Sequence, residues 1–155
     1  MKPSFPLAAV FAAMLSLSAC GGGGGGAGSD NTATLGAGVR IVSETAGTGT
    51  AAATGNRVQV NYTGWLYSAT AADNKGTQFD TSVGPGKAPI EFVVGASNII
   101  PGFSQGVNGM KVGGKRTVVV PASLGYGAAG SPPVIPGNAD LVFDLELVKV
   151  CGATC

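Results

Sequence analysis

The chain has 155 residues, of which 45% are apolar and 11% are charged, and its net charge at neutral pH is +1. The charged fraction is well below the roughly 25% of an average globular protein, and a net charge near zero does not favour a nucleic acid or an anionic membrane surface as partner. The chain has no histidine, which excludes a histidine-based triad and histidine ligation of a metal. We expect no metal site and no cofactor.

Residues 1–19 have the features of a secretory signal peptide. Lys2 supplies a short positive region, and the apolar run at 7–17 is well short of the roughly 20 residues that a spanning helix needs. The run ends in Leu-Ser-Ala followed by Cys20, which resembles the lipobox of bacterial lipoproteins. Several acyl chains on Cys20 would meet the need for more than one lipid in stable anchoring. The alternative is an ordinary cleavage site followed by a chance cysteine.

The residue after Cys20 is Gly21 rather than aspartate. By the same resemblance, we expect a lipid-anchored protein of the cell envelope, at the outer membrane and facing the periplasm or the surface. Residues 20–38 are mostly glycine and small polar residues, which cannot bury enough apolar surface to become ordered, so we expect a flexible tether. The folded domain is then expected at 39–150, followed by a tail at 151–155.

Alternation of apolar and polar residues predicts strands within the expected domain. It is clearest at 58–63 and 141–147, and shorter strands are predicted at 39–43, 90–94 and 116–120. Runs of glycine and proline separate these segments. The pattern predicts a twisted antiparallel sheet of about five strands.

One short helix is predicted after residue 100. Pro101 suits the first turn of a helix, and Asn98 is a possible cap a little upstream. Phe103, Val107 and Met110 follow at spacings that share one helical face, and Gly113 is expected to end the helix. Together with the strands, this gives an α+β domain.

Five short motifs occur in a fixed order along this domain. They are Val-Gln-Val-Asn-Tyr-Thr-Gly at 58–64, Gln-Phe-Asp-Thr-Ser at 78–82, Gly-Tyr-Gly at 125–127, Val-Ile-Pro at 134–136 and Leu-Val-Phe-Asp-Leu-Glu-Leu at 141–147. The set contains aromatic side chains, no nucleophile–base pair and no metal cluster. It resembles the FKBP-type peptidyl-prolyl cis-trans isomerases over residues 39–150.

The resemblance implies the FKBP fold, in which a twisted sheet packs on one short helix, and a pocket for the substrate proline. The expected catalytic residues are Tyr62, Phe79, Asp80, Tyr126 and Phe143. The expected substrate-binding residues are Ile99, Ile100, Phe103 and Ile135. The resemblance also implies that the Ile100 N–H and the Tyr126 hydroxyl hold substrate carbonyls, that Asp80 lies beside Tyr62, and that Phe103 is the pocket floor, where many relatives have tryptophan.

Each of these residues also has a structural interpretation. The aromatic residues could be plain core, Asp80 could be a turn residue, and Tyr126 could be a turn aromatic. The chain also departs from the family pattern in two places. The segment 67–77 is longer than in the smallest members, and we expect it to be a longer hairpin loop near the site. The segment 83–87 lacks the usual arginine near Asp80, which Lys87 could replace.

The function implied is acceleration of Xaa-Pro bond rotation in proline-containing polypeptides of the envelope. A dry aromatic pocket suits this reaction, because the twisted amide of the transition state is less polar than the planar amide. Macrolide inhibitors of the FKBP class are expected ligands, and a monomer is the expected state. The alternatives are an FKBP-like chaperone or binding module with little isomerase activity and, more remotely, an adhesion or virulence factor.

Two cysteines, Cys151 and Cys155, lie in the tail. Two cysteines alone make a poor metal site, and the periplasm is oxidising. A small disulfide loop is the first interpretation, and two free thiols are the second.

Overall fold

The computed structural model describes residues 34–35, 38–152 and 154–155. This part of the chain forms seven strands, one α-helix and two 3₁₀ turns. Their bounds are β1 Thr34–Leu35, β2 Val39–Thr45, β3 Arg57–Tyr67, η1 Ala72–Asn74, β4 Lys75–Thr81, β5 Ile90–Val93, α1 Pro101–Val107, β6 Lys115–Val120, η2 Ala122–Leu124 and β7 Leu141–Cys151.

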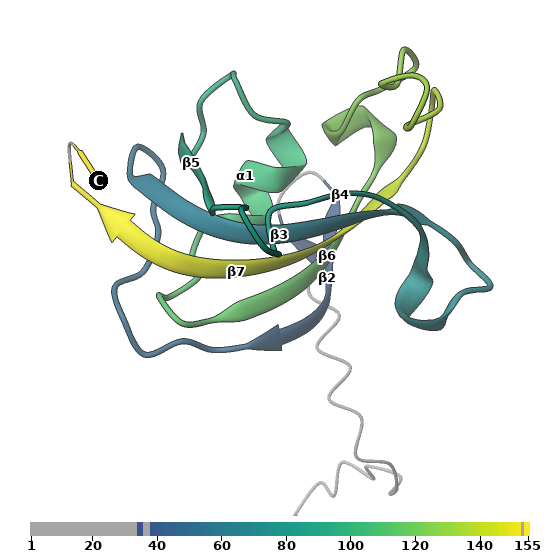
Figure 1. Cartoon of the computed structure of the whole chain (residues 1–155). Coiled ribbons are helices and arrows are strands. Elements are labelled where there is room, and N and C mark those ends of the chain that lie inside the picture. The colour runs from purple at the N-terminus through teal and green to yellow at the C-terminus, as the bar shows by residue number, and fades with distance from the viewer. Residues whose placement is uncertain (1–33, 36–37, 153) are drawn as a thin grey trace, which may run out of the picture.

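All the strands pair antiparallel in one sheet. The order is β1-β2-β6-β7-β3-β4, and β5 pairs with a further part of β3. Figure 1 shows the sheet curving beneath α1, with the loop between η2 and β7 rising beside the helix. We call the face that packs on α1 the inner face and the opposite face the outer face. The α+β fold predicted from the sequence is confirmed.

The core lies between α1 and the inner face, and the strand alternation predicts it well. On β3, Val58 and Val60 are fully buried, whereas Gln59 between them is partly exposed. The inward residues of β7 and the apolar face of the helical segment are buried as well. These two sets are Leu141, Phe143, Leu145 and Leu147 from β7, and Phe103, Val107 and Met110 from the helical segment.

The helix begins at Pro101, as predicted, but its predicted cap and its predicted end are wrong. The N-cap is Ile100, without a side-chain hydrogen bond, so Asn98 does not cap the helix. The helix ends at Val107 rather than near Gly113, because the chain turns there. Gly109 has a φ of 80°, a left-handed conformation that breaks the helical path.

A buried arginine holds the end of α1 against the sheet. Arg116 of β6 is 6% exposed, and its Nη1 donates to the carbonyl of Gly106 at 2.7 Å and to that of Asn108 at 3.2 Å. Its Nη2 lies 2.6 Å from Oε1 of Glu44 on β2. One guanidinium therefore satisfies carbonyls that the end of a helix leaves without partners and links α1 to two strands.

The sheet contains two strands that were not predicted. β1 pairs with β2, and Leu35 packs against the core, so the sheet begins before residue 39, within the segment expected to be tether. β4 begins at Lys75, inside the segment expected to be a loop. That segment does close a hairpin between β3 and β4. The segment was also expected to lie near the site. Its Lys75 ammonium instead lies 2.8 Å from Asp144, on the outer face of the sheet.

The remaining N-terminal predictions lie outside the described residues. These are the signal peptide, Cys20 as a lipidation site and most of the tether. Within the described part of the chain, no helix is both long and apolar enough to cross a membrane.

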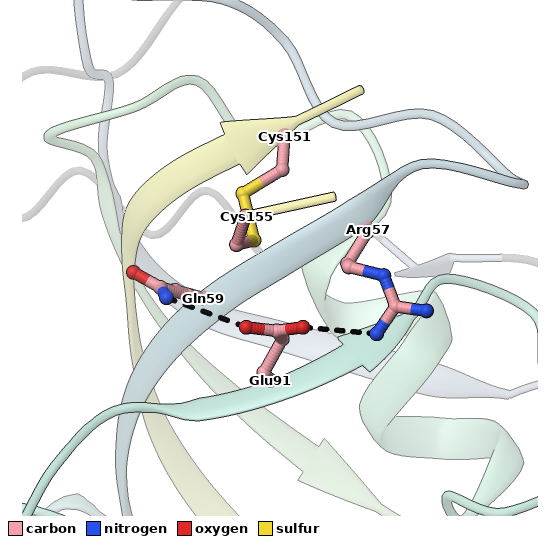
Figure 2. Close-up of a disulfide and its surroundings, with 5 residues drawn as sticks. All are labelled: Arg57, Gln59, Glu91, Cys151 and Cys155. Atoms are coloured by element: carbon pink, nitrogen blue, oxygen red, sulfur yellow. Dashed lines mark hydrogen bonds and ion pairs between the residues drawn. A yellow bond between two sulfur atoms is a disulfide. The ribbon is translucent and has the colours of Figure 1, made fainter. Parts of the chain in front are cut away.

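The tail is joined to β7 by a disulfide, as predicted. Cys151 is the last residue of β7 and pairs in register with Arg57. Its sulfur is bonded to that of Cys155, with 5.0 Å between the two Cα atoms. Figure 2 shows the end of the tail returning toward β3, near the ion pair of Arg57 with Glu91.

Replacing Cys155 with serine should lower the free energy of unfolding, because the disulfide restricts the unfolded chain. The loss should be only about 2 kcal/mol, because the loop that the disulfide closes is very short. Chemical denaturation of the oxidised wild type and the variant would measure the difference. The control is wild type with its disulfide reduced, which should match the variant. Equal stability of variant and oxidised wild type, with two free thiols found by titration, would show that the bond does not form.

Candidate functional site

Five aromatic rings from five different elements meet between the sheet and α1. They are Tyr62 of β3, Phe79 of β4, Phe92 of β5, Phe103 of α1 and Phe143 of β7. We call them the aromatic cluster. Phe103 is its centre, because its ring centroid lies 5.3 Å from Phe143, 5.5 Å from Tyr62 and 5.5 Å from Phe92, each edge to face. This is a favourable geometry for aromatic pairs.

The cluster has a buried base and a partly exposed edge. Phe92, Phe103 and Phe143 are each only 3% exposed, whereas Tyr62 and Phe79 are half-buried. Phe79 packs on Phe143 with 5.7 Å between their centroids. Phe103 thus lies deep in the cluster, as a floor would. An apolar ligand group bound at this edge would contact rings whose other faces are already buried away from water.

Tyr62 and Asp80 form a fixed polar pair at this edge. The Tyr62 hydroxyl donates to Oδ2 of Asp80, while Oδ1 of Asp80 accepts the N–H of Thr81 at 2.8 Å. Burial raises the pKa of Tyr62 above its ordinary range, and the hydrogen bond and charge of Asp80 raise it further. The nearby Tyr126 adds a smaller rise in the same direction. Tyr62 therefore stays protonated and continues to donate to Asp80.

Lys87 does not take the place of the missing arginine. Its ammonium donates to the carbonyl of Thr81 at 2.7 Å. Among the described residues, no cation lies within ion-pair distance of Asp80. The hydroxyl of Tyr62 and the backbone of Thr81 hold this carboxylate instead.

A backbone donor lies at the start of α1, beside the aromatic cluster. The carbonyl of Ile100 accepts the N–H groups of Phe103 and Ser104, at 3.1 and 3.3 Å. The N–H of Ile100 itself donates to no other described residue. Ile99 and Ile100 are half-buried and pack against the core cluster that includes Phe103. An unpaired N–H next to apolar side chains can hold a carbonyl group of a ligand.

The loop between β6 and β7 carries Tyr126, which is exposed, and Ile135, which is buried in the core. Tyr126 is 40% exposed and Ile135 is 4% exposed. Gly127 has a φ of 61°, a conformation that suits glycine, and its carbonyl accepts the N–H of Asn138 at 2.8 Å. The loop is therefore braced by its backbone, and the Tyr126 side chain remains accessible beside Tyr62.

The structure thus brings together four predicted aromatic residues, with Asp80 bonded to one of them and two isoleucines against the same core: Tyr62, Phe79, Phe103, Phe143, Asp80, Ile99 and Ile100. Phe92 is the member of the aromatic cluster that the sequence prediction missed. The signal was present, because residues 90–94 were predicted to be a strand and Phe92 shares a face with Ile90. It was missed because that strand carries no motif of its own.

A different hollow, of about 340 Å³, is lined mainly by outer-face residues of β2, β3, β6 and β7. Its acidic residues are Asp144 and Glu146, which pair with Lys75 at 2.8 Å and with Lys115 at 3.6 Å. A lining of this kind is polar and charged, whereas a twisted amide gains from dry aromatic surroundings. The aromatic cluster is therefore the better candidate site.

Comparison with known proteins gives consistent matches. Residues 48–148 match the sequence profile described as FKBP-type peptidyl-prolyl cis-trans isomerase. The chain is 50% identical over 99 residues to the peptidyl-prolyl cis-trans isomerase FPR2 of Saccharomyces cerevisiae, covering 64% of this chain and 68% of the yeast protein. It is 41% identical over 104 residues to an FK506-binding protein of Neisseria meningitidis, covering 67% of this chain and 88% of that protein. The fold resembles the crystal structure of a peptidyl-prolyl cis-trans isomerase from Pseudomonas syringae, with a TM-score of 0.62, 32% identity, and coverage of 76% of this chain and 79% of that one.

Proposed function

The chain belongs to the FKBP-type peptidyl-prolyl cis-trans isomerase family and is an enzyme of that type, and from this premise we propose that the aromatic cluster is its active site. The observation that carries the proposal is the half-buried edge of Tyr62 and Phe79 above the buried ring of Phe103. The unpaired N–H of Ile100 lies beside it.

The rings act by favouring the twisted amide over the planar one. Amide resonance sets a barrier of about 18–20 kcal/mol to peptide-bond rotation. The twisted transition state has lost that resonance, so its carbonyl and nitrogen are less polar than in the planar state. A dry aromatic surface binds the twisted form more tightly, and this difference in binding lowers the barrier.

Polar groups around the rings hold the substrate and shape the site. The Ile100 N–H holds one carbonyl of the substrate, and the Tyr126 hydroxyl holds another. Asp80 fixes the ring of Tyr62 through its hydroxyl. No bond is made or broken and no proton moves in this scheme, so it needs no general base.

We propose that the enzyme acts on Xaa-Pro bonds of proteins in the cell envelope, as a lipid-anchored monomer at the outer membrane. The support is the apolar segment 7–17, Cys20 directly after Leu-Ser-Ala, and Gly21 after it. The glycine-rich segment that follows would give the enzyme reach from the membrane surface.

Replacing Cys20 with alanine should abolish acylation and move the protein from the detergent phase to the aqueous phase on phase partitioning. Mass spectrometry of the mature wild-type protein should find its first residue to be an acylated Cys20. The replacement of Ser18 with alanine is the control, because it leaves the acceptor thiol in place. An unmodified mature N-terminus at another position would contradict the anchor.

A macrolide of the FK506 class should compete with peptide substrate for the aromatic cluster. We expect weaker binding than in a relative with tryptophan at the floor, because phenylalanine offers less apolar surface. Replacing Phe103 with tryptophan should therefore tighten binding, as measured by competition with a labelled macrolide. The control is the replacement of Val134, an exposed residue, with alanine. Macrolide binding that leaves isomerase activity unchanged would place the ligand elsewhere.

A further inference from the structure

Phe79 and Asp80 are neighbours in β4, yet both side chains reach inner-face aromatics. The ring of Phe79 packs 5.7 Å from that of Phe143, and the carboxylate of Asp80 accepts the hydroxyl of Tyr62. Successive residues of a regular strand point to opposite faces. The regular alternation must therefore be broken between them.

The pairing of β4 with β3 shows where it is broken. Gly64 pairs with Asp80, but the next residue, Trp65, pairs with Gln78. One step along β3 thus corresponds to two steps along β4, and Phe79 is the additional residue. This is a β-bulge, a feature that re-aims a side chain next to a site.

The residue opposite the bulge is a glycine, and its missing side chain is what makes room. Gly64 is buried, and it lies on the inner face between Tyr62 and Leu66. A methyl group at position 64 would lie 2.5 Å from Cζ and 2.8 Å from Cε2 of Phe79, and 2.9 Å from Cε1 of Phe143. The two rings therefore occupy the space that any side chain at position 64 would fill.

We propose that Gly64 is a positioning residue of the isomerase site, acting through the bulged Phe79. The bulge directs the side chain of Phe79 to the inner face, where the side chain of Asp80 also lies. The absence of a Cβ at position 64 lets the Phe79 ring lie close against β3. The position of this ring sets the exposed edge of the aromatic cluster. The inference rests on the proposal that the aromatic cluster is the active site.

Gly64→Ala should lower kcat/KM for short Xaa-Pro peptides by about 10- to 100-fold, the scale expected when a catalytic wall is displaced by about 1 Å. The matched control is Gly76→Ala in β4. A methyl group there would be similarly crowded, at 2.8 Å from the Leu66 carbonyl and 3.2 Å from Cβ of Ser68, but these contacts involve no aromatic ring. It should change kcat/KM by less than about twofold.

A rescue separates positioning from general crowding. The closest contacts of the added methyl group are with the far end of the Phe79 ring, which leucine lacks. In a Phe79→Leu background, Gly64→Ala should therefore cost less than about threefold, since residues that act as one unit are not additive. An equal loss in both backgrounds would overturn the proposal, as would failure of the double variant to fold.

A readout independent of catalysis keeps the inference distinct from the proposed function. In the wild type, NMR should show close contacts between the rings of Phe79 and Phe143, and Gly64→Ala should remove or shift them while Gly76→Ala leaves them intact. If the wild type lacked isomerase activity, the active-site proposal would fail, and the NMR result would still decide the role of Gly64. Unchanged ring contacts in Gly64→Ala would reject that role.

Discussion

Replacing Phe79 with alanine should lower kcat/KM for Xaa-Pro peptides by about 10- to 100-fold. Burial of a large apolar side chain is worth about 1.5–3 kcal/mol, and each 1.36 kcal/mol of transition-state stabilisation is about tenfold in rate. Phe79 packs on Phe143 at the half-buried edge, so its loss would let water reach the reacting amide. The preference for the twisted state would then weaken.

The matched comparison is Tyr126→Phe, which keeps the ring and removes one hydroxyl. It should cost only about 0.5–1.5 kcal/mol, the net value of one hydrogen bond. Both variants should keep the stability of the isolated domain within a few kcal/mol, as circular dichroism and denaturation would show. If Phe79→Ala folded and retained the wild-type kcat/KM, the Phe79 ring would not be the part of the pocket wall that shields the reacting amide from water.

Replacing Arg116 with methionine should destabilise the protein by about 3 kcal/mol or more, because each buried polar group that loses its hydrogen-bond partner costs about 1–3 kcal/mol. The change would leave the carbonyls of Gly106 and Asn108 without their donor and Glu44 without its partner. These carbonyls lie at the C-terminal end of α1. The loss of stability should therefore appear first in this helix, which carries Phe103. Urea denaturation followed by circular dichroism would measure the stability.

The neighbouring residue provides the control. Lys115 is 67% exposed in its side chain and lies 3.6 Å from Glu146, so Lys115→Met should change stability by less than about 1 kcal/mol. Hydrogen exchange should show lost protection of α1 in Arg116→Met and little change in Lys115→Met. Equal stability of the two variants would mean that Arg116 does not brace the helix.

Most of the fold could be predicted because its signals are local. Val58 and Val60 alternate with polar residues, and the inward residues of β7 do so over a longer run. The ordered motifs then identified the family. The first turn at Pro101 was predicted, but the cap and the end of the helix were missed, because Asn98 is a good cap in general whereas Ile100 is the N-cap of α1. Capping depends on the path of the chain into the helix, which local composition does not specify.

The residues of the site were predicted from the family resemblance, together with the contact of Asp80 with Tyr62 and the deep position of Phe103, but the strand register that produces them was not. The sequence shows Phe79 and Asp80 side by side, which in a regular strand would place them on opposite faces. Only the register between β3 and β4 reveals the bulge that brings them together. The contact of Tyr62 with Asp80 was expected from the family resemblance alone, because a contact between two strands depends on how they pair and not on local sequence. The catalytic roles of these residues remain proposals.

The most direct test of the account is a protease-coupled isomerisation assay on the purified mature protein, with short Xaa-Pro peptides as substrates. We predict that the wild type accelerates the cis-to-trans step well above buffer and that Phe79→Ala loses most of this acceleration. The contradicting result is a wild type that gives no acceleration and yet still binds unfolded polypeptides. The aromatic cluster would then serve a binding module rather than an isomerase.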